Sequence, residues 1–144
     1  MDSESKSATR ILAALAESSS KSMTLVHHLQ SMPEVEEVYF DFDCYKNQSY
    51  WEFGSGSPYV FDWYVDVALK NGNAIWWMLD VQWDEKRWII KSGVELPGKY
   101  GSNTLKGFPD RFAETIDEFI VQLNEATSQL LASADLIETQ INVS

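Results

Sequence analysis

The spacing of apolar residues predicts a helical region at each end of the chain and a run of strands between them. In residues 3–31, apolar side chains recur at helical intervals and form one stripe. This stripe consists of Ile11, Leu15, Val26 and Leu29, with Leu12 and Leu25 at its margins. The sequence ESSSKS at 17–22 dilutes the stripe, so the region is either one helix with a weak middle or two helices. Pro33 ends it, because the residue before a proline disfavours helical backbone angles.

From residue 35 the apolar period changes to two, which is typical of strands. In 35–45, one side of the strand carries Val38, Phe40, Phe42 and Cys44, and the other carries Tyr39, Asp41, Asp43 and Tyr45. The segment 59–70 is the clearest strand, because its odd positions are continuously apolar. Further strands are expected at 74–83 and 87–96. Residues 45–58 suggest a short strand at 49–53 followed by a flexible GSGS loop.

Two turns set the expected register of these strands. The sequence NGN at 71–73 predicts a hairpin with a three-residue loop, since a two-residue loop would carry Asp66 to the face that holds Trp77. The predicted pairs are Leu69 with Ile75, Val67 with Trp77, Val65 with Leu79 and Trp63 with Val81. The second turn is DEKR, at 84–87. It should place Asp84 opposite Arg87, Trp83 opposite Trp88, Val81 opposite Ile90 and Asp80 opposite Lys91.

After a glycine-rich connection at 96–107, the helical period returns in residues 109–140. Its apolar positions are Phe112, Ile116, Phe119, Ile120, Leu123, Leu130 and Ile137. One helix over this range would be about 48 Å long, more than a small domain needs, and SAD at 133–135 could restart it as a separate turn. We predict a single α+β domain over 1–144. In this two-layer sandwich, an antiparallel meander of four or five strands carries the N-terminal and C-terminal helices on one face.

The phase of the strands divides their side chains between a helix-covered face and an open face. Four tryptophans belong to the covered face as core residues: Trp63, Trp77, Trp83 and Trp88. The open face carries the residues that we predict to bind a partner: Tyr39, Asp41, Asp43, Asp62, Tyr64, Asp66, Trp76, Met78 and Asp80, with Ile89 and Lys91 beside them.

Stability alone does not favour this open face, because each directly opposed pair of like charges costs about 0.2–1 kcal/mol. Aromatic anchors among charged groups are typical of protein interfaces, which favours a binding role. The alternative is an ordinary solvated face, or one partly covered by the loop at 45–58.

Charge and cysteine content narrow the class of partner and the compartment. The chain has 22 acidic and 11 basic residues, a net charge of −11, which attracts basic proteins and disfavours nucleic acid and anionic membranes. Acidity can also serve solubility alone. One cysteine, Cys44, cannot form an internal disulfide, and no apolar run approaches the ~20 residues of a membrane span. The start MDSESKSATR lacks the basic region of a signal peptide, so we expect a cytoplasmic protein.

No catalytic motif accompanies the carboxylates. Asp41 with Asp43, or Asp62 with Asp66, could contribute to a cation site or to a glycosidase acid/base pair, yet no metal-binding loop spacing accompanies them. His27 and His28 are adjacent, so a helix points them about 100° apart and they cannot chelate one ion. The loop GKYGSNTLKG does not match a phosphate-binding loop. We expect no enzyme activity, catalytic residue, metal or cofactor.

In size, acidity and its aromatic-acidic meander VFDWYVDVALKNGNAIWWMLDVQW, the chain resembles the immunity proteins of bacterial polymorphic-toxin and contact-dependent-inhibition systems. The resemblance implies a cytoplasmic monomer or homodimer that neutralises a basic toxin domain by binding it.

Two other functional classes stay open. A secretion-type chaperone would bind an extended segment of a client and use the residues beyond Ala132 to associate. A small-ligand or sugar-binding domain, or an enzyme, would instead use the carboxylates of the open face.

Overall fold

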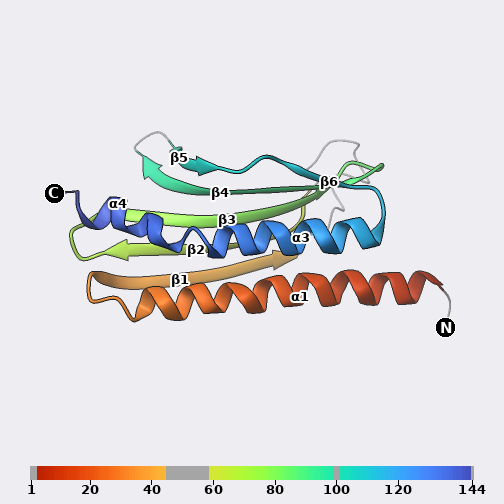
Figure 1. Cartoon of the computed structure of the whole chain (residues 1–144), viewed down its shortest axis with the longest axis horizontal. Coiled ribbons are helices and arrows are strands. Elements are labelled where there is room, and N and C mark those ends of the chain that lie inside the picture. The colour runs from red at the N-terminus through yellow and green to blue at the C-terminus, as the bar shows by residue number, and fades with distance from the viewer. Residues whose placement is uncertain (1–2, 45–58, 99–100, 144) are drawn as a thin grey trace.

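The computed structural model describes residues 3–44, 59–98 and 101–143. Its elements are α1 (Ser3–Gln30), β1 (Val35–Cys44), β2 (Tyr59–Leu69), β3 (Ala74–Trp83), β4 (Trp88–Gly98), β5 (Gly101–Gly107), β6 (Arg111–Ala113), α3 (Ile116–Leu131), the 3₁₀ helix η1 (Ala134–Ile137) and α4 (Glu138–Ile141). The strands form an antiparallel sheet in the order β1-β2-β3-β4-β5, with β6 also paired to β4. Figure 1 shows α3 in front of the sheet and α1 beside β1, both aligned with the strands. The predicted α+β fold class is confirmed.

The N-terminal helix α1 is continuous through the serine-rich segment that was expected to weaken it. Ser18 and Ser22 are fully buried and continue the apolar stripe toward Leu25 and Leu29. The Ser18 hydroxyl lies 2.7 Å from the Thr127 hydroxyl of α3. Ser18 therefore forms part of the contact between the two helices, and the buried serines are accommodated without a break in α1.

The helices cover one face of the sheet, which we call the inner face. On β2 and β3 the odd-numbered side chains from Phe61 to Leu69 and from Ile75 to Val81 are buried, whereas the even-numbered ones are half-buried or exposed. The indole N–H of Trp63 donates to Ser18 Oγ at 2.9 Å, and that of Trp77 donates to the Ser133 carbonyl at 3.2 Å. The predicted core positions of both tryptophans are confirmed.

Two further tryptophans lie on the inner face, at the end of β3 and the start of β4. Trp83 and Trp88 are opposite each other, as predicted, with ring centroids 4.7 Å apart. Trp88 also packs on Phe119 of α3, at 5.1 Å between centroids. Both tryptophans are half-buried, because they lie at the end of the sheet next to the turn at 84–87.

The β2–β3 hairpin has the expected three-residue loop, but its register is two residues from the one predicted. Val67 pairs with Ile75, and the remaining apolar pairs are Val65 with Trp77, Trp63 with Leu79 and Phe61 with Val81. The loop comprises 70–72, not 71–73: the Leu69 N–H donates to the Asn73 carbonyl, and Gly72 has φ +92°. A shift of two keeps every side chain on its expected face.

The β3–β4 register agrees with the prediction in all its pairs, including Asp80 opposite Lys91. Asp84 holds the turn, because its Oδ1 accepts the N–H of Lys86 at 3.1 Å and of Arg87 at 2.9 Å. These backbone hydrogen bonds keep the pKa of Asp84 below its ordinary value. A carboxylate at this position thus specifies the turn and, through it, the alignment of β3 with β4.

The glycine-rich connection expected at 96–107 is wrong, because this segment forms the last three residues of β4 and all of β5. Weak strand propensity is overridden here by the neighbouring strand: β5 pairs with β4 from Gly93 to Gly98. A Cβ on Gly98 would lie 2.6 Å from the Gly101 carbonyl oxygen, so this close approach requires glycine.

The C-terminal helix begins at Ile116, not at 109 as predicted. Thr115 caps it, accepting the Glu118 N–H, while the Glu118 carboxylate accepts the N–H of Glu114. Residues 111–113 instead form β6, which leaves Phe112 exposed under the Arg87 guanidinium. The capping sequence TIDE was the signal for the true start. The helix ends at Leu131, and the SAD segment begins a separate 3₁₀ turn.

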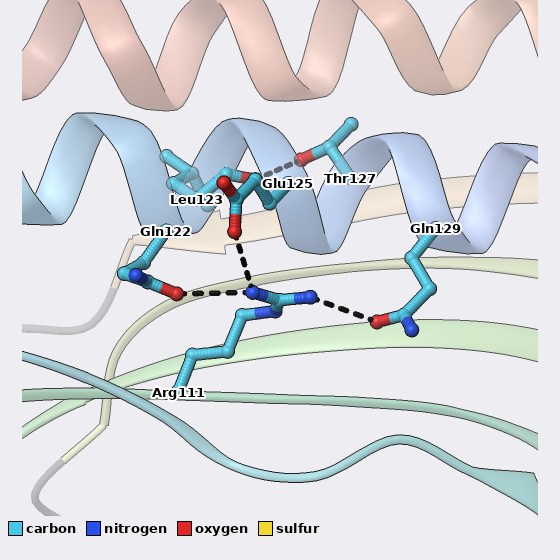
Figure 2. A network of polar contacts seen from close by, with 6 residues as sticks. All are labelled: Arg111, Gln122, Leu123, Glu125, Thr127 and Gln129. Carbon is cyan, nitrogen blue, oxygen red and sulfur yellow. Dashed lines mark hydrogen bonds and ion pairs between the residues drawn. The ribbon is translucent and has the colours of Figure 1, made fainter.

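Two polar clusters fasten the C-terminal region to the sheet. Figure 2 shows Arg111 of β6 reaching three side chains of α3, namely Gln122 at 3.0 Å, Glu125 at 2.8 Å and Gln129 at 3.3 Å. Further along, the side-chain amides of Asn71 and Asn73 donate to the Gln140 carbonyl at 2.9 and 3.0 Å. The hairpin loop is therefore bound to the last helical turn.

Some expectations fall outside the described residues. These are the short strand at 49–53, the GSGS loop, and the question of whether 45–58 covers the open face; the Cys44 side chain is likewise not among those described. In the described ranges, no helix is both long and apolar enough to cross a membrane.

Candidate protein-binding surface

The nine predicted partner-binding residues lie together on the face of the sheet opposite the helices, which we call the outer face. Cross-strand pairing arranges them in three rows that run from β1 to β4. The first row is Asp43, Asp62, Asp80 and Lys91; the second is Asp41, Tyr64, Met78 and Gly93; the third is Tyr39, Asp66, Trp76 and Glu95. The expected grouping is therefore present, and the rows show which side chains are direct neighbours.

The first row places three carboxylates on three adjacent strands. Asp62 is directly opposite Asp43 on one side and Asp80 on the other. Burial, followed by the Asp62 carboxylate, raises the pKa of Asp80 to about 6, although Lys91 opposes the shift. The Lys91 ammonium lies 3.6 Å from the Asp110 carboxylate, so this base is shared with an acid outside the row. The row itself contains three acids and one base.

Aromatic side chains stand among these acids. Tyr39 is 54% exposed, and its ring centroid lies 6.2 Å from that of Tyr64 on the neighbouring strand. Burial and then the Asp41 carboxylate raise the pKa of the Tyr64 phenol, so the hydroxyl stays protonated and able to donate. The indole Nε1 of Trp76 is buried and has no hydrogen-bond partner in the part of the chain that the structure describes. The outer face thus offers both apolar rings and polar groups.

The acidic character extends to two residues that the sequence interpretation did not include. Burial raises the pKa of Asp66, and the negative charge of Glu37 acts in the same direction. Glu37 therefore belongs to the same negative region. Glu95 ends the third row and accepts a hydrogen bond from the Thr104 hydroxyl at 3.2 Å. Both were detectable, because Glu37 and Glu95 continue the alternation of Tyr39 and Lys91 along their strands.

A shallow hollow of about 240 Å³ lies on this face over β3, β4 and β5. Its lining includes Met78, Asp80, Lys91 and Glu95. Gly93 forms its floor, where an added Cβ would lie 3.1 Å from the Lys106 carbonyl oxygen. The mixture of a thioether, two acids and one base suits a charged side chain of a partner better than an apolar one.

The acids of the outer face do not assemble into a metal centre. Among the described residues there is no group of three or more His, Cys, Asp or Glu side chains placed to hold a metal ion. Comparisons with protein-family models, with curated proteins and with solved structures found no match for this chain.

Proposed function

We propose that this chain is an acidic binding protein that captures a basic protein on the outer face of its sheet, in the manner of an immunity protein that neutralises a toxin. The observation that carries the proposal is the row Asp43–Asp62–Asp80, three carboxylates on adjacent strands with one lysine at the end.

The arrangement of this row opposes folding, which makes a binding role the better explanation for it. Directly opposed like charges cost about 0.2–1 kcal/mol per pair. Neutral polar side chains at the same positions would keep the alternation of polar and apolar residues along the strands without this cost. Burial, followed by the Asp62 carboxylate, raises the pKa of Asp80 to about 6, so its charged form is poorly solvated. A lysine or arginine from a partner would relieve both costs, and it would speed association through long-range attraction.

The aromatic residues supply the apolar part of such an interface. Tyrosine and tryptophan are enriched at the centres of protein interfaces, where they contribute most of the affinity. Tyr39 and Trp76 lie in the same row on either side of Asp66. A basic side chain bound at Asp66 would therefore be flanked by aromatic rings.

The chaperone alternative has less support. The apolar residues Leu130 and Ile137, which a C-terminal dimer surface would need, are buried within the chain. The Gln140 carbonyl is hydrogen-bonded to the hairpin loop. No specific observation on the outer face favours a small-ligand or enzyme function.

The proposal is tested by affinity capture from lysate of the cells that produce the protein, at low and high salt, with mass spectrometry of the bound proteins. The test variant is Asp43→Lys with Asp66→Lys, because both side chains are exposed and their replacement leaves the core intact. The control is Asp135→Lys with Glu138→Lys, which changes the net charge equally at exposed positions of the C-terminal turns.

We expect the parent and the control to retain a basic protein that high salt releases, and the outer-face variant to lose it. Equal retention by the outer-face variant and the control would remove this face as the binding surface. A retained partner that is acidic or neutral would contradict the proposal as well.

A further inference from the structure

An apolar groove lies between α1 and the end of β1, on the helix side of the sheet. Its volume is about 560 Å³. Its lining is mainly apolar and includes Leu12, Leu15, Met23, Phe40, Phe42 and Phe61. Leu12, at the margin of the predicted apolar stripe, is 62% exposed, and Phe42 is 51% exposed although its strand phase predicted the inner side. Two large apolar side chains thus remain accessible at one end of an otherwise closed core.

The groove adjoins an edge strand. Within the described ranges, β1 pairs only with β2, so its other side forms an edge of the sheet. The Phe42 N–H donates to the carboxylate of its own neighbour, Asp41, at 2.8 Å. This amide is therefore directed away from β2, and alternation along an antiparallel strand directs the Phe40 amide the same way.

The two faces of β1 differ in chemistry along this edge. On the inner side, Phe40 and Phe42 form part of the apolar groove. On the outer side, Asp41 and Asp43 belong to the acidic rows. A strand placed beside β1 would alternate its own side chains between these two environments. Its inner residues would contact apolar groups, and its outer residues would meet carboxylates.

We propose that the β1 edge binds an extended segment of the partner in which apolar and basic residues alternate. This inference rests on the proposed function, because the segment belongs to the basic partner that the outer face captures. Backbone hydrogen bonds to β1 hold the segment, and the groove and the two aspartates select its alternate side chains.

Charge argues for this occupant over a second copy of the chain. A two-fold pairing of β1 strands centred on Phe40 would place Asp43 of one copy opposite Glu37 of the other. The opposite edge of the sheet fits a basic strand less well, because β5 has the sequence GSNTLKG, with one lysine and no acid. Acids on an edge strand prevent self-pairing while still admitting a basic strand.

The test uses synthetic peptides and the full chain. The probe is a peptide as long as β1, 10 residues, of alternating lysine and valine, with binding measured by calorimetry at about 0.15 M ionic strength. One control peptide has the same composition in two blocks, five lysines then five valines in place of alternation. A second has the probe sequence N-methylated at every other residue, which removes the donors of one edge.

We expect the alternating peptide to bind at least about tenfold more tightly than either control peptide. Leu12→Ser should weaken its binding by about tenfold, because a serine there removes apolar contact area from the groove. Val121→Ser is the matched control: it replaces another exposed aliphatic residue, on α3 and outside the groove, and should leave affinity unchanged. Thermal denaturation of each variant checks that the fold is retained.

Equal binding of the alternating and block peptides, or an unaffected Leu12→Ser variant, would overturn the edge inference. The proposed function would survive that result if the basic partner is still captured through Asp43 and Asp66. A dimer that Leu12→Ser converts to a monomer would also overturn the inference, because a second copy would then occupy the edge.

Discussion

The inner and outer faces of the sheet are built from the same strands, yet they treat polar groups in opposite ways. On the inner face, the indole N–H groups of Trp63 and Trp77 both have acceptors, and no charged side chain is among the buried residues described. On the outer face, Asp62 is opposite two other aspartates, and the Trp76 indole nitrogen lacks a partner within the described residues.

This difference distinguishes residues that stabilise the fold from residues that the fold tolerates. Inner-face side chains bury apolar surface and satisfy their hydrogen bonds, as a stable core requires. Outer-face carboxylates repel one another and are partly desolvated. Truncating the inner face should therefore lower the free energy of unfolding, whereas neutralising the outer face should raise it. Four predictions test this contrast.

The largest effect is expected from Trp63→Ala, compared with Trp76→Ala on the outer face. Loss of the fully buried Trp63 should cost about 3–5 kcal/mol of stability, because it leaves a cavity and removes the hydrogen bond from the indole to Ser18. Trp76 is half-buried, so its loss should cost about 1–2 kcal/mol. Urea denaturation measures both values. Equal costs would contradict the assignment of the two faces.

The next effect concerns the polar contact inside the inner face. Ser18→Ala should cost about 1–3 kcal/mol, because it leaves the buried Trp63 N–H without its acceptor. Ser20→Ala, two positions along α1 and exposed, should change stability by less than about 0.5 kcal/mol. The same denaturation experiment compares them. A Ser18 variant as stable as the Ser20 variant would show that the packing of α1 on β2 does not depend on the hydrogen bond between Trp63 and Ser18.

The third prediction concerns the outer face and pH. The pKa of Asp80 is about 6 in the folded chain, above its ordinary 3.8, so the folded state binds this proton more tightly than the unfolded state. The stability that this bound proton contributes is fully present below pH 4 and is lost as the pH rises through about 6. At pH 7, Asp80→Asn should be more stable than the parent by about 1 kcal/mol, allowing for solvent screening, and the difference should vanish near pH 4.

A control for this profile is Asp84→Asn, at the turn. The pKa of Asp84 is lowered by backbone hydrogen bonds from Lys86 and Arg87, so its stabilising effect is present at neutral pH and lost on acidification. Its profile should have the opposite sign to that of Asp80. Profiles of the same sign for both variants would mean that Asp80 is not destabilised by burial.

The smallest effect is expected from Asp43→Asn, at the exposed end of the first row. Removing one of two opposed charges should raise stability by about 0.2–1 kcal/mol in low salt. The gain should shrink in 1 M salt, where screening acts over about 3 Å. Chemical denaturation at the two salt concentrations measures the gain. A loss of stability instead would indicate that Asp43 has a stabilising contact.

The faces of the strands were predictable because alternation is a local property. The odd positions of β2 and β3 are continuously apolar, so their burial followed from the sequence, and a register error of two residues left each face unchanged. Where a charged residue defined a turn, as Asp84 does, even the register was predictable. The membership of the outer face therefore agreed with expectation.

Features that depend on distant partners were not predictable in the same way. The strand β5 forms because β4 supplies its hydrogen bonds, although its own residues favour a loop. The row from Asp43 to Asp80 requires the β1–β2 register, and Cys44 and Tyr59 lie too far apart in the sequence for a turn motif to predict it. Phe42 has the phase of a core residue, but α1 and β1 leave a groove beside it. Phase gives the direction of a side chain and not what covers it.

The hydrogen bonds between the hairpin loop and the last helical turn affect the chemical ageing of the protein. Asparagine followed by glycine readily loses its side-chain nitrogen through a cyclic imide, and Asn71 precedes Gly72. Here the Asn71 amide is engaged with the Gln140 carbonyl, and the attacking Gly72 nitrogen donates to the Leu69 carbonyl. Both reacting groups are thus restrained in the folded chain. Deamidation, monitored by mass spectrometry during storage, should be slow in buffer and fast in urea. Equal rates would show that these hydrogen bonds give no protection.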